Sequence, residues 1–236
     1  MYRMKGRIRY SECGPDNKLT LSSLINYFQD CTSENSQLLG VGVDYMKERQ
    51  KAWVVFSWQI EVERYPSCSE EVVVETWATG FRGIMGPRDF CMKTVDGEIL
   101  AKASSIWVFV DANTGKPTKP EPRDLELYTV GEPQEMKPVS KRILPAEELI
   151  WVDTFPVRKY HIDTNNHVNN VQYIRMAEGI LPDGYAVNSI RVEYKNPAVL
   201  GDDIVLKVSN EEDRIVAQLL DKEDKVFVIV EFRGEA

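Results

Sequence analysis

An internal repeat constrains the fold of this 236-residue chain more than any other feature. In each half, one apolar helical pattern precedes a series of strand-like runs. Residues 60–72 contain a strand, a proline-containing turn, an acidic pair and the start of a second strand, and residues 190–204 contain the same sequence of features. The chain therefore carries one folding unit twice.

Each unit is predicted to combine one helix with several strands. The first helix is marked by apolar residues from Leu21 to Phe28, with Gly40 beyond its end, and the second by apolar residues at 168–181, before Pro182. Strands are expected at 53–64, 70–80, 88–94 and 99–110, and again at 187–194, 203–209, 213–220 and 225–233. One helix with antiparallel strands, twice, is an α+β architecture. Because a long helix with a wide apolar face needs a curved sheet around it, the pattern predicts a double hot dog.

A proline-rich segment separates the two copies. Half of the twelve prolines lie between residues 117 and 145, where apolar periodicity is weak. We therefore expect an N-terminal unit at 1–125, a linker at 126–147 and a C-terminal unit at 148–236.

Composition excludes several classes of function. The net charge of −8 argues against a nucleic-acid binder, which must neutralise phosphates, and against an anionic membrane surface as the main partner. No apolar run approaches the roughly 18 residues of a membrane span, and no signal peptide is evident. The four cysteines show no paired spacing, so we expect free thiols, a cytoplasmic protein, and neither a metal nor a cofactor.

The most informative local motif is Asp163-Thr164-Asn165-Asn166-His167-Val168-Asn169-Asn170, which contains one of only two histidines. It places an acid, an amide and an imidazole in a turn that leads into a helix. Backbone N–H groups at a helix start favour a developing negative charge, and an imidazole can act as a general base. The alternative interpretation is an asparagine-rich turn and helix cap without chemistry.

These residues resemble the active-site region of acyl-acyl-carrier-protein (acyl-ACP) thioesterases, whose pattern is Asp-x-Asn-x-His-Val-Asn-Asn followed by Val-x-Tyr-Ile. In the first half, residues 24–30, 88–90 and 103–111 are also similar to that family. The resemblance implies two fused hot-dog units, with an acyl-chain pocket in the first and the catalytic motif in the second. It implies hydrolysis of fatty acyl-ACP to free acid and ACP, which ends chain elongation, and it assigns Asp163, Asn165 and His167 as catalytic.

One departure from the family limits the mechanism. Plant members carry a Tyr-x-x-Glu-Cys stretch where this chain has Tyr194-Lys195-Asn196-Pro197-Ala198. A cysteine nucleophile at that position is therefore excluded, and we favour direct attack by water. His167 is the expected base, with Asn165 orienting water or supporting the oxyanion and Asp163 holding the imidazole or the water. The alternative makes Asp163 the base and His167 a hydrogen-bond donor.

Other polar residues near the motif are expected to be structural. Glu178 and Glu193 are the available carboxylates, and we interpret them as a solvated helix charge and a cross-strand pair. His161 is interpreted as a surface or packing histidine. The four cations at positions 3, 5, 7 and 9 share one strand face, which is either a docking surface for acidic ACP or the solvated outer face of the strand.

Three other functions stay open at this point. The chain is also compatible with an acyl-CoA thioesterase, a hot-dog hydratase or dehydratase, or a non-catalytic acyl-thioester-binding protein. Hydratases place histidine three residues after asparagine with a proline between, whereas here the spacing is two without proline. A homo-oligomer is compatible with the sequence.

Overall fold

A computed structural model describes residues 1–140, 142–146 and 148–235 of the chain. The chain divides into two compact units, Met1–Lys137 (unit 1) and Pro138–Ala236 (unit 2). The elements of unit 1 are β1 (Tyr2–Arg7), η1 (Tyr10–Glu12), α1 (Leu21–Leu38), α2 (Val43–Glu48), β2 (Lys51–Val62), β3 (Glu71–Ala78), β4 (Met85–Thr94), β5 (Ile99–Asp111) and α3 (Pro122–Leu125). Those of unit 2 are β6 (Ile150–Pro156), η2 (Lys159–His161), α4 (Asn170–Glu178), β7 (Ala186–Tyr194), β8 (Asp203–Asn210), β9 (Ile215–Leu220) and β10 (Val226–Glu235).

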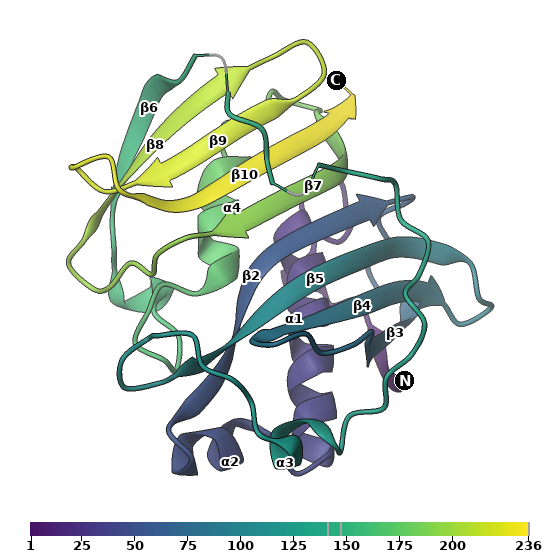
Figure 1. Cartoon of the computed structure of the whole chain (residues 1–236). Helices are drawn as coiled ribbons and strands as arrows, with labels where there is room; N and C mark the ends of the chain where they lie inside the picture. The colour runs from purple at the N-terminus through teal and green to yellow at the C-terminus, as the bar shows by residue number, and fades with distance from the viewer. Residues whose placement is uncertain (141, 147, 236) are drawn as a thin grey trace. The chain divides into compact units, whose positions relative to one another are not determined.

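The two units have the same strand order. In unit 1 the order is β1-β3-β4-β5-β2, and in unit 2 it is β6-β8-β9-β10-β7. All of these neighbours within each unit pair antiparallel. In Figure 1 one principal helix, α1 or α4, lies on the far side of each sheet. Each unit is a hot-dog fold, and the predicted double hot dog is confirmed.

The core of each unit forms between its principal helix and the inner face of its sheet. In unit 1, Phe28 of α1 is fully buried and lies 5.3 Å from the ring of Phe90 and 6.3 Å from that of Trp58. In unit 2, Ile174 and Ala177 of α4 are equally buried, and α4 packs against β9 and β10. The apolar spacing that predicted the helices therefore marks the faces that bury hydrophobic surface.

The described part of the proline-rich segment is irregular but held by hydrogen bonds at several points. In unit 1 the N–H of Gly131 donates to the carbonyl of Ala78 at 2.8 Å, and that of Lys137 donates to the buried carboxylate of Glu61 at 2.8 Å. In unit 2 the N–H of Ile143 donates to buried Glu193 at 2.6 Å. Within the segment, Lys137 and Ile143 are thus each anchored by a buried glutamate.

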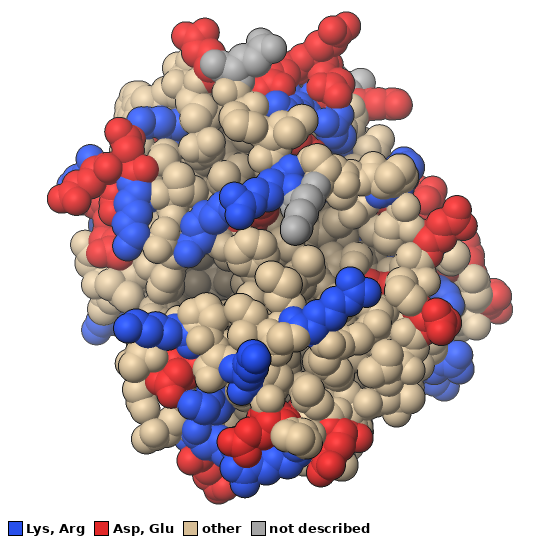
Figure 2. Space-filling model, in the orientation of Figure 1, with Lys and Arg blue, Asp and Glu red and all other residues tan. Residues whose placement is uncertain are grey.

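The described residues also bear on membrane spanning and on surface charge. None of the helices among them is both long and apolar enough to cross a membrane. Lysine and arginine side chains are interspersed with acidic ones on the face drawn in Figure 2.

Candidate active site

The expected catalytic motif forms a closed turn between η2 and α4. Ile162 and Val168 form an antiparallel bridge at its base. Inside it, the N–H of Asp163 donates to the carbonyl of His167 at 2.9 Å, and that of Asn166 to the carbonyl of Asp163 at 3.1 Å. Asn166 has a φ of 62°, a left-handed conformation that asparagine tolerates well. We call residues 163–167 the site turn.

All three predicted catalytic residues lie on the site turn. The carboxylate of Asp163 is half-buried and accepts the N–H of Asn165 at 2.7 Å, so the acid also fixes the turn. Asn165 and His167 are exposed, and within the described ranges their side chains have no hydrogen-bond partner. The imidazole and the amide are therefore available to a substrate or to a water molecule.

The start of α4 offers fewer free backbone donors than expected. Four of its N–H groups already have acceptors. The N–H of Val168 donates to the carbonyl of Ala198 at 2.9 Å, and that of Asn169 to the carbonyl of His161 at 2.8 Å. The N–H of Val171 donates to the side chain of Asn169 at 3.0 Å, and that of Gln172 to the Asn169 carbonyl at 2.9 Å. These four groups would have to leave their acceptors before they could hold an oxyanion. The side chain of Asn165, by contrast, is exposed and has no hydrogen-bond partner among the described residues.

Unit 1 contains the same turn between η1 and α1. The N–H of Gly14 donates to the carbonyl of Lys18 at 2.8 Å, that of Asn17 donates to the carbonyl of Gly14 at 3.0 Å, and Asn17 also has a φ of 62°. By this pattern Gly14 takes the place of Asp163, Asp16 that of Asn165 and Lys18 that of His167. Unit 1 thus has the backbone of the site, but it has no acid at the place of Asp163 and no imidazole at that of His167.

The stretch in which plant relatives carry glutamate and cysteine lies against the base of the site turn. The carbonyl of Ala198 accepts the N–H of Val168 at 2.9 Å, and its N–H donates to the hydroxyl of Tyr173 at 2.8 Å. Pro197 and Ala198 bring neither an acid nor a thiol to this place. This contact joins residues far apart in the sequence, and only the resemblance to the family's motif indicated it.

The two carboxylates considered as substitutes are placed differently from expectation. Glu178, expected to be solvated, is half-buried at the end of α4, and burial raises its pKa. Glu193 is only 4% exposed. It pairs with Lys195 and accepts the N–H of Ile143, so it is an anchor rather than a simple cross-strand partner. No hydrogen bond or ion pair among the described residues links either acid to the site turn.

His161 has the structural role that the sequence favoured. It is buried, and its Nδ1 accepts the N–H of Arg158 at 3.1 Å. Burial and the neighbouring Arg158 cation lower its pKa, so the neutral ring is stabilised. In unit 1 the carboxylate of Glu12 accepts the N–H of Arg9 at 2.8 Å in the same way.

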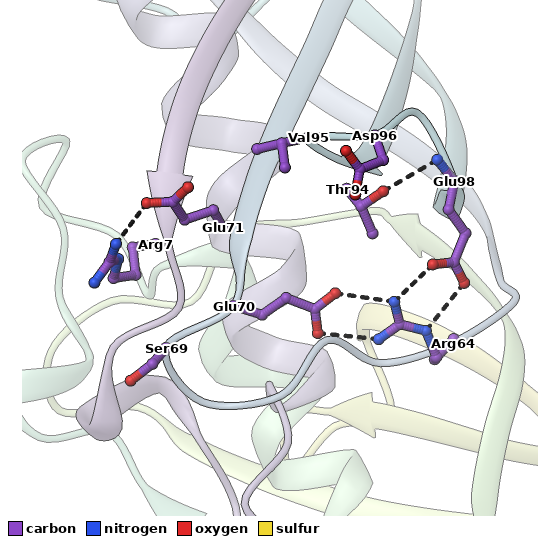
Figure 3. A pocket seen from close by; sticks show the side chains of 9 residues that line it. All are labelled: Arg7, Arg64, Ser69, Glu70, Glu71, Thr94, Val95, Asp96 and Glu98. Carbon is purple, nitrogen blue, oxygen red and sulfur yellow. Dashed lines mark hydrogen bonds and ion pairs between the residues drawn. The ribbon is translucent and has the colours of Figure 1, made fainter.

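A cavity of about 640 Å³ in unit 1 has no residue of the site turn in its lining, and Figure 3 shows the residues that line it. Its walls carry charged groups that pair with one another. Arg64 binds Glu70 and Glu98, and Arg7 binds Glu71. Because it is lined by ion pairs, this cavity is unsuited to an alkyl chain and is not the acyl pocket expected in unit 1.

The cysteines and the basic strand also have defined positions. All four cysteines are free, as expected, and Cys13 and Cys68, which are far apart in the sequence, are close enough to interact. Desolvation and a hydrogen bond with the Cys68 thiol raise the pKa of Cys13. On β1, Arg3 forms an ion pair with Glu75 at 2.7 Å, and Arg7 is also paired. Part of the basic stripe is therefore neutralised.

Sequence profiles identify relatives of both units. The profile of the acyl-ACP thioesterase N-terminal domain matches residues 1–128, and that of the acyl-ACP thioesterase C-terminal domain matches residues 146–233. The two matches cover most of the chain.

Curated relatives come from plants. The chain is 27% identical over 227 residues to oleoyl-acyl carrier protein thioesterase 1 of Arabidopsis thaliana, covering 86% of this chain and 62% of that protein. It is 30% identical over 190 residues to palmitoyl-acyl carrier protein thioesterase of Cuphea hookeriana, covering 74% and 45%. The chain thus spans less than two thirds of the length of these relatives.

Solved structures share the fold. An acyl-ACP thioesterase from Bacteroides thetaiotaomicron has a TM-score of 0.89 at 20% identity, covering 99% of this chain and 97% of that one. The 12:0-ACP thioesterase from Umbellularia californica has a TM-score of 0.87 at 20% identity, covering 99% and 96%.

Proposed function

The chain belongs to the acyl-ACP thioesterase family, and we propose that it hydrolyses fatty acyl-ACP to free fatty acid and ACP, ending acyl-chain elongation in fatty acid synthesis. The observation that carries this proposal is the site turn. It gathers the three residues that match the family's catalytic positions, and it leaves the imidazole of His167 and the amide of Asn165 without partners among the described residues. The same turn in unit 1 has glycine at the place of Asp163 and lysine at that of His167.

The proposed chemistry needs no protein nucleophile. His167 takes a proton from water, whose oxygen forms a bond to the thioester carbonyl carbon. The amide of Asn165 donates to the oxygen on which negative charge develops. As the carbon–sulfur bond breaks, the proton passes to the departing thiolate of the phosphopantetheine arm. Asp163 shapes the turn through its bond to the N–H of Asn165 and places its charge beside the reacting groups.

The base could be either of two groups. The half-buried carboxylate of Asp163 already accepts one hydrogen bond, whereas the imidazole of His167 is exposed and has no partner among the described residues. We therefore assign His167 as the base. If Asp163 were the base, a His167→Gln variant, which keeps a hydrogen-bond donor, would retain most of the activity.

We propose ACP as the carrier of the substrate and the cytoplasm as the compartment. ACP is acidic, and this chain presents lysine and arginine side chains on the face in Figure 2 despite its net charge of −8. Complementary charge raises the rate of encounter. The four free cysteines suit a reducing compartment.

The test is steady-state hydrolysis of a panel of acyl-ACP and acyl-CoA substrates of different chain length by the purified protein. We expect free thiol and fatty acid, with ACP the better donor. His167→Ala should lower kcat by about 10²–10⁴, the usual contribution of general acid–base catalysis, with KM little changed. Lys18→Ala, at the matching position in unit 1, is the control and should retain wild-type kcat.

Other outcomes would contradict the proposal. An enoyl thioester product would identify a hydratase or dehydratase. Acyl-ACP binding without turnover would identify a non-catalytic binding protein, which the lack of an acid at Pro197 and Ala198 makes a real alternative. A folded His167→Ala variant with wild-type kcat would remove His167 from the mechanism.

A further inference from the structure

Tyr173 connects the two segments that meet at the base of the site turn. Its side chain is only 2% exposed, and its hydroxyl accepts the N–H of Ala198 at 2.8 Å. The carbonyl of the same residue accepts the N–H of Val168, which directly follows His167. One phenol on α4 thereby fixes the peptide on which the end of the site turn rests.

Unit 1 provides an internal comparison for this arrangement. Its principal helix follows the cap residue Thr20, as α4 follows Asn169. The N–H of Leu19 donates to the carbonyl of Pro66 at 2.8 Å, the counterpart of the Val168–Ala198 bond. Pro66 therefore occupies the place of Ala198 and has no N–H.

The residue of α1 that corresponds to Tyr173 also lacks the group needed for this hydrogen bond. Counted from the cap residue, Leu24 of α1 corresponds to Tyr173 of α4. Leu24 is fully buried but has no hydroxyl. This hydrogen bond from helix to backbone thus exists in the unit whose turn carries the imidazole of His167, and both its donor and its acceptor are missing from the unit whose turn has Lys18 at that place. Core packing alone does not require it.

The surroundings of Tyr173 keep its hydroxyl protonated. Burial, opposed by the hydrogen bond from Ala198 and supported by the charges of Asp202 and Asp163, raises the pKa of Tyr173 to about 12. The neutral phenol accepts the N–H of Ala198 and keeps its own proton. Asp163, a proposed site residue, is one of the two acids that interact with it.

We propose that Tyr173 is a positioning residue of this active site: through Ala198 it holds the end of the site turn, and thus His167, where the imidazole meets the thioester. This rests on the proposed hydrolase function. The residue acts through the peptide and does not touch the substrate. Its loss should therefore lower kcat more than it changes KM.

Two variants remove the same hydrogen bond from opposite sides. Tyr173→Phe deletes the acceptor, and Ala198→Pro deletes the donor by installing the residue that unit 1 uses. We expect each to lower kcat about tenfold with KM within about twofold, and the double variant to be no slower than either single one, because both remove one interaction. Tyr27→Phe is the matched control, since its hydroxyl donates to Glu12 in unit 1 at 2.9 Å; it should leave kcat unchanged.

A readout independent of activity completes the test. Hydrogen exchange of the Ala198 amide, followed by NMR, should be faster in Tyr173→Phe than in the wild type while the amides of the β9 core stay protected. Faster exchange at Ala198 in Tyr173→Phe with unchanged kcat would overturn the proposal, and so would unchanged kcat in a folded Ala198→Pro variant. So would additive losses of kcat in the double variant. If Tyr173→Phe does not fold, the Ala198→Pro result decides alone.

The failure of this inference can be distinguished from failure of the proposed function. A wild-type protein without thioester hydrolysis refutes the function itself. A wild type that is active and loses activity in His167→Ala, but not in Tyr173→Phe or Ala198→Pro, leaves the function intact and refutes only the role of Tyr173.

Discussion

Replacing Arg214 by methionine should destabilise the chain because it breaks a buried ion pair in unit 2. The guanidinium is 8% exposed and lies 2.9 Å from the carboxylate of Glu231, which is 3% exposed. It also binds Glu211 at 2.6 Å and donates to the carbonyls of Leu144 and Pro145 at 3.2 and 3.1 Å. Methionine keeps the apolar stem and removes all four interactions.

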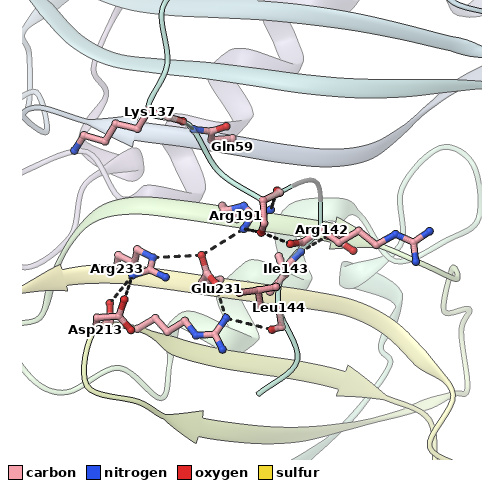
Figure 4. A network of polar contacts seen from close by, with 12 residues as sticks. Gln59, Lys137, Arg142, Ile143, Leu144, Arg191, Asp213, Glu231 and Arg233 are labelled. Carbon is pink, nitrogen blue, oxygen red and sulfur yellow. Dashed lines mark hydrogen bonds and ion pairs between the residues drawn. The ribbon is translucent and has the colours of Figure 1, made fainter. Parts of the chain in front are cut away.

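The magnitude follows from what remains around Glu231. Removing one partner of a buried pair typically costs about 3–5 kcal/mol, because the other charge stays buried. Here Glu231 keeps Arg233 at 3.4 Å and Arg191 at 3.7 Å (Figure 4), which places the expected loss near the lower limit, about 3 kcal/mol. The exposed carbonyls of Leu144 and Pro145 can bind water instead and add little.

The assay is urea unfolding followed by circular dichroism. With a slope of about 3 kcal/mol per molar, a loss of about 3 kcal/mol moves the midpoint down by about 1 M urea. Lys207→Met is the control, because Lys207 pairs at 2.6 Å with Asp224, whose side chain is 72% exposed, and should lose no more than about 1 kcal/mol. Equal losses in the two variants, or a loss below about 1 kcal/mol for Arg214→Met, would refute the reasoning.

Two further predictions concern His161 and the four cysteines. Because the pKa of His161 is lowered in the folded protein, the unfolded chain takes up a proton as pH falls through about 6.5 while the folded ring stays neutral, so stability falls as pH drops through this window. The difference in unfolding free energy between pH 7 and pH 5 should therefore be smaller in His161→Gln than in the wild type. Equal differences in the two proteins would count against this role of His161. Serine at all four cysteine positions should leave turnover largely intact, because none of them lies on the site turn. Inactivation by a single Cys→Ser change in a folded protein would point to covalent catalysis instead.

Much of the fold was predictable from local patterns, because strands and helices are marked by which side chains they bury. All eight strands expected from the sequence are present, with ends shifted by a few residues. The second helix was expected to reach Leu181 but ends at Glu178. Beyond it the N–H groups of Ile180 and Leu181 bond three residues back, so the apolar spacing continues in a tighter turn. Strand β6 was missed because its consecutive apolar residues, such as Trp151, are exposed and do not alternate.

The candidate site was predictable only in part. The motif located Asp163, Asn165 and His167, and the structure places them on one turn, although their roles stay a prediction. The Tyr173–Ala198 bond, the bond from the Val168 N–H to Ala198 and the burial of Glu178 arise from segments far apart in the chain or from packing. No short-range pattern reports such contacts.

The anchoring of the proline-rich segment has a consequence for dissecting the protein into halves. An N-terminal fragment ending at 125 would lack the backbone of Lys137 and leave the buried carboxylate of Glu61 without that donor. A C-terminal fragment beginning at 148 would deprive Glu193 of the N–H of Ile143 in the same way. Cleavage of the single peptide bond between Lys137 and Pro138 keeps both donors with their acceptors. Two fragments separated at that bond should therefore complement each other, whereas fragments that end at residue 125 and begin at residue 148 should not.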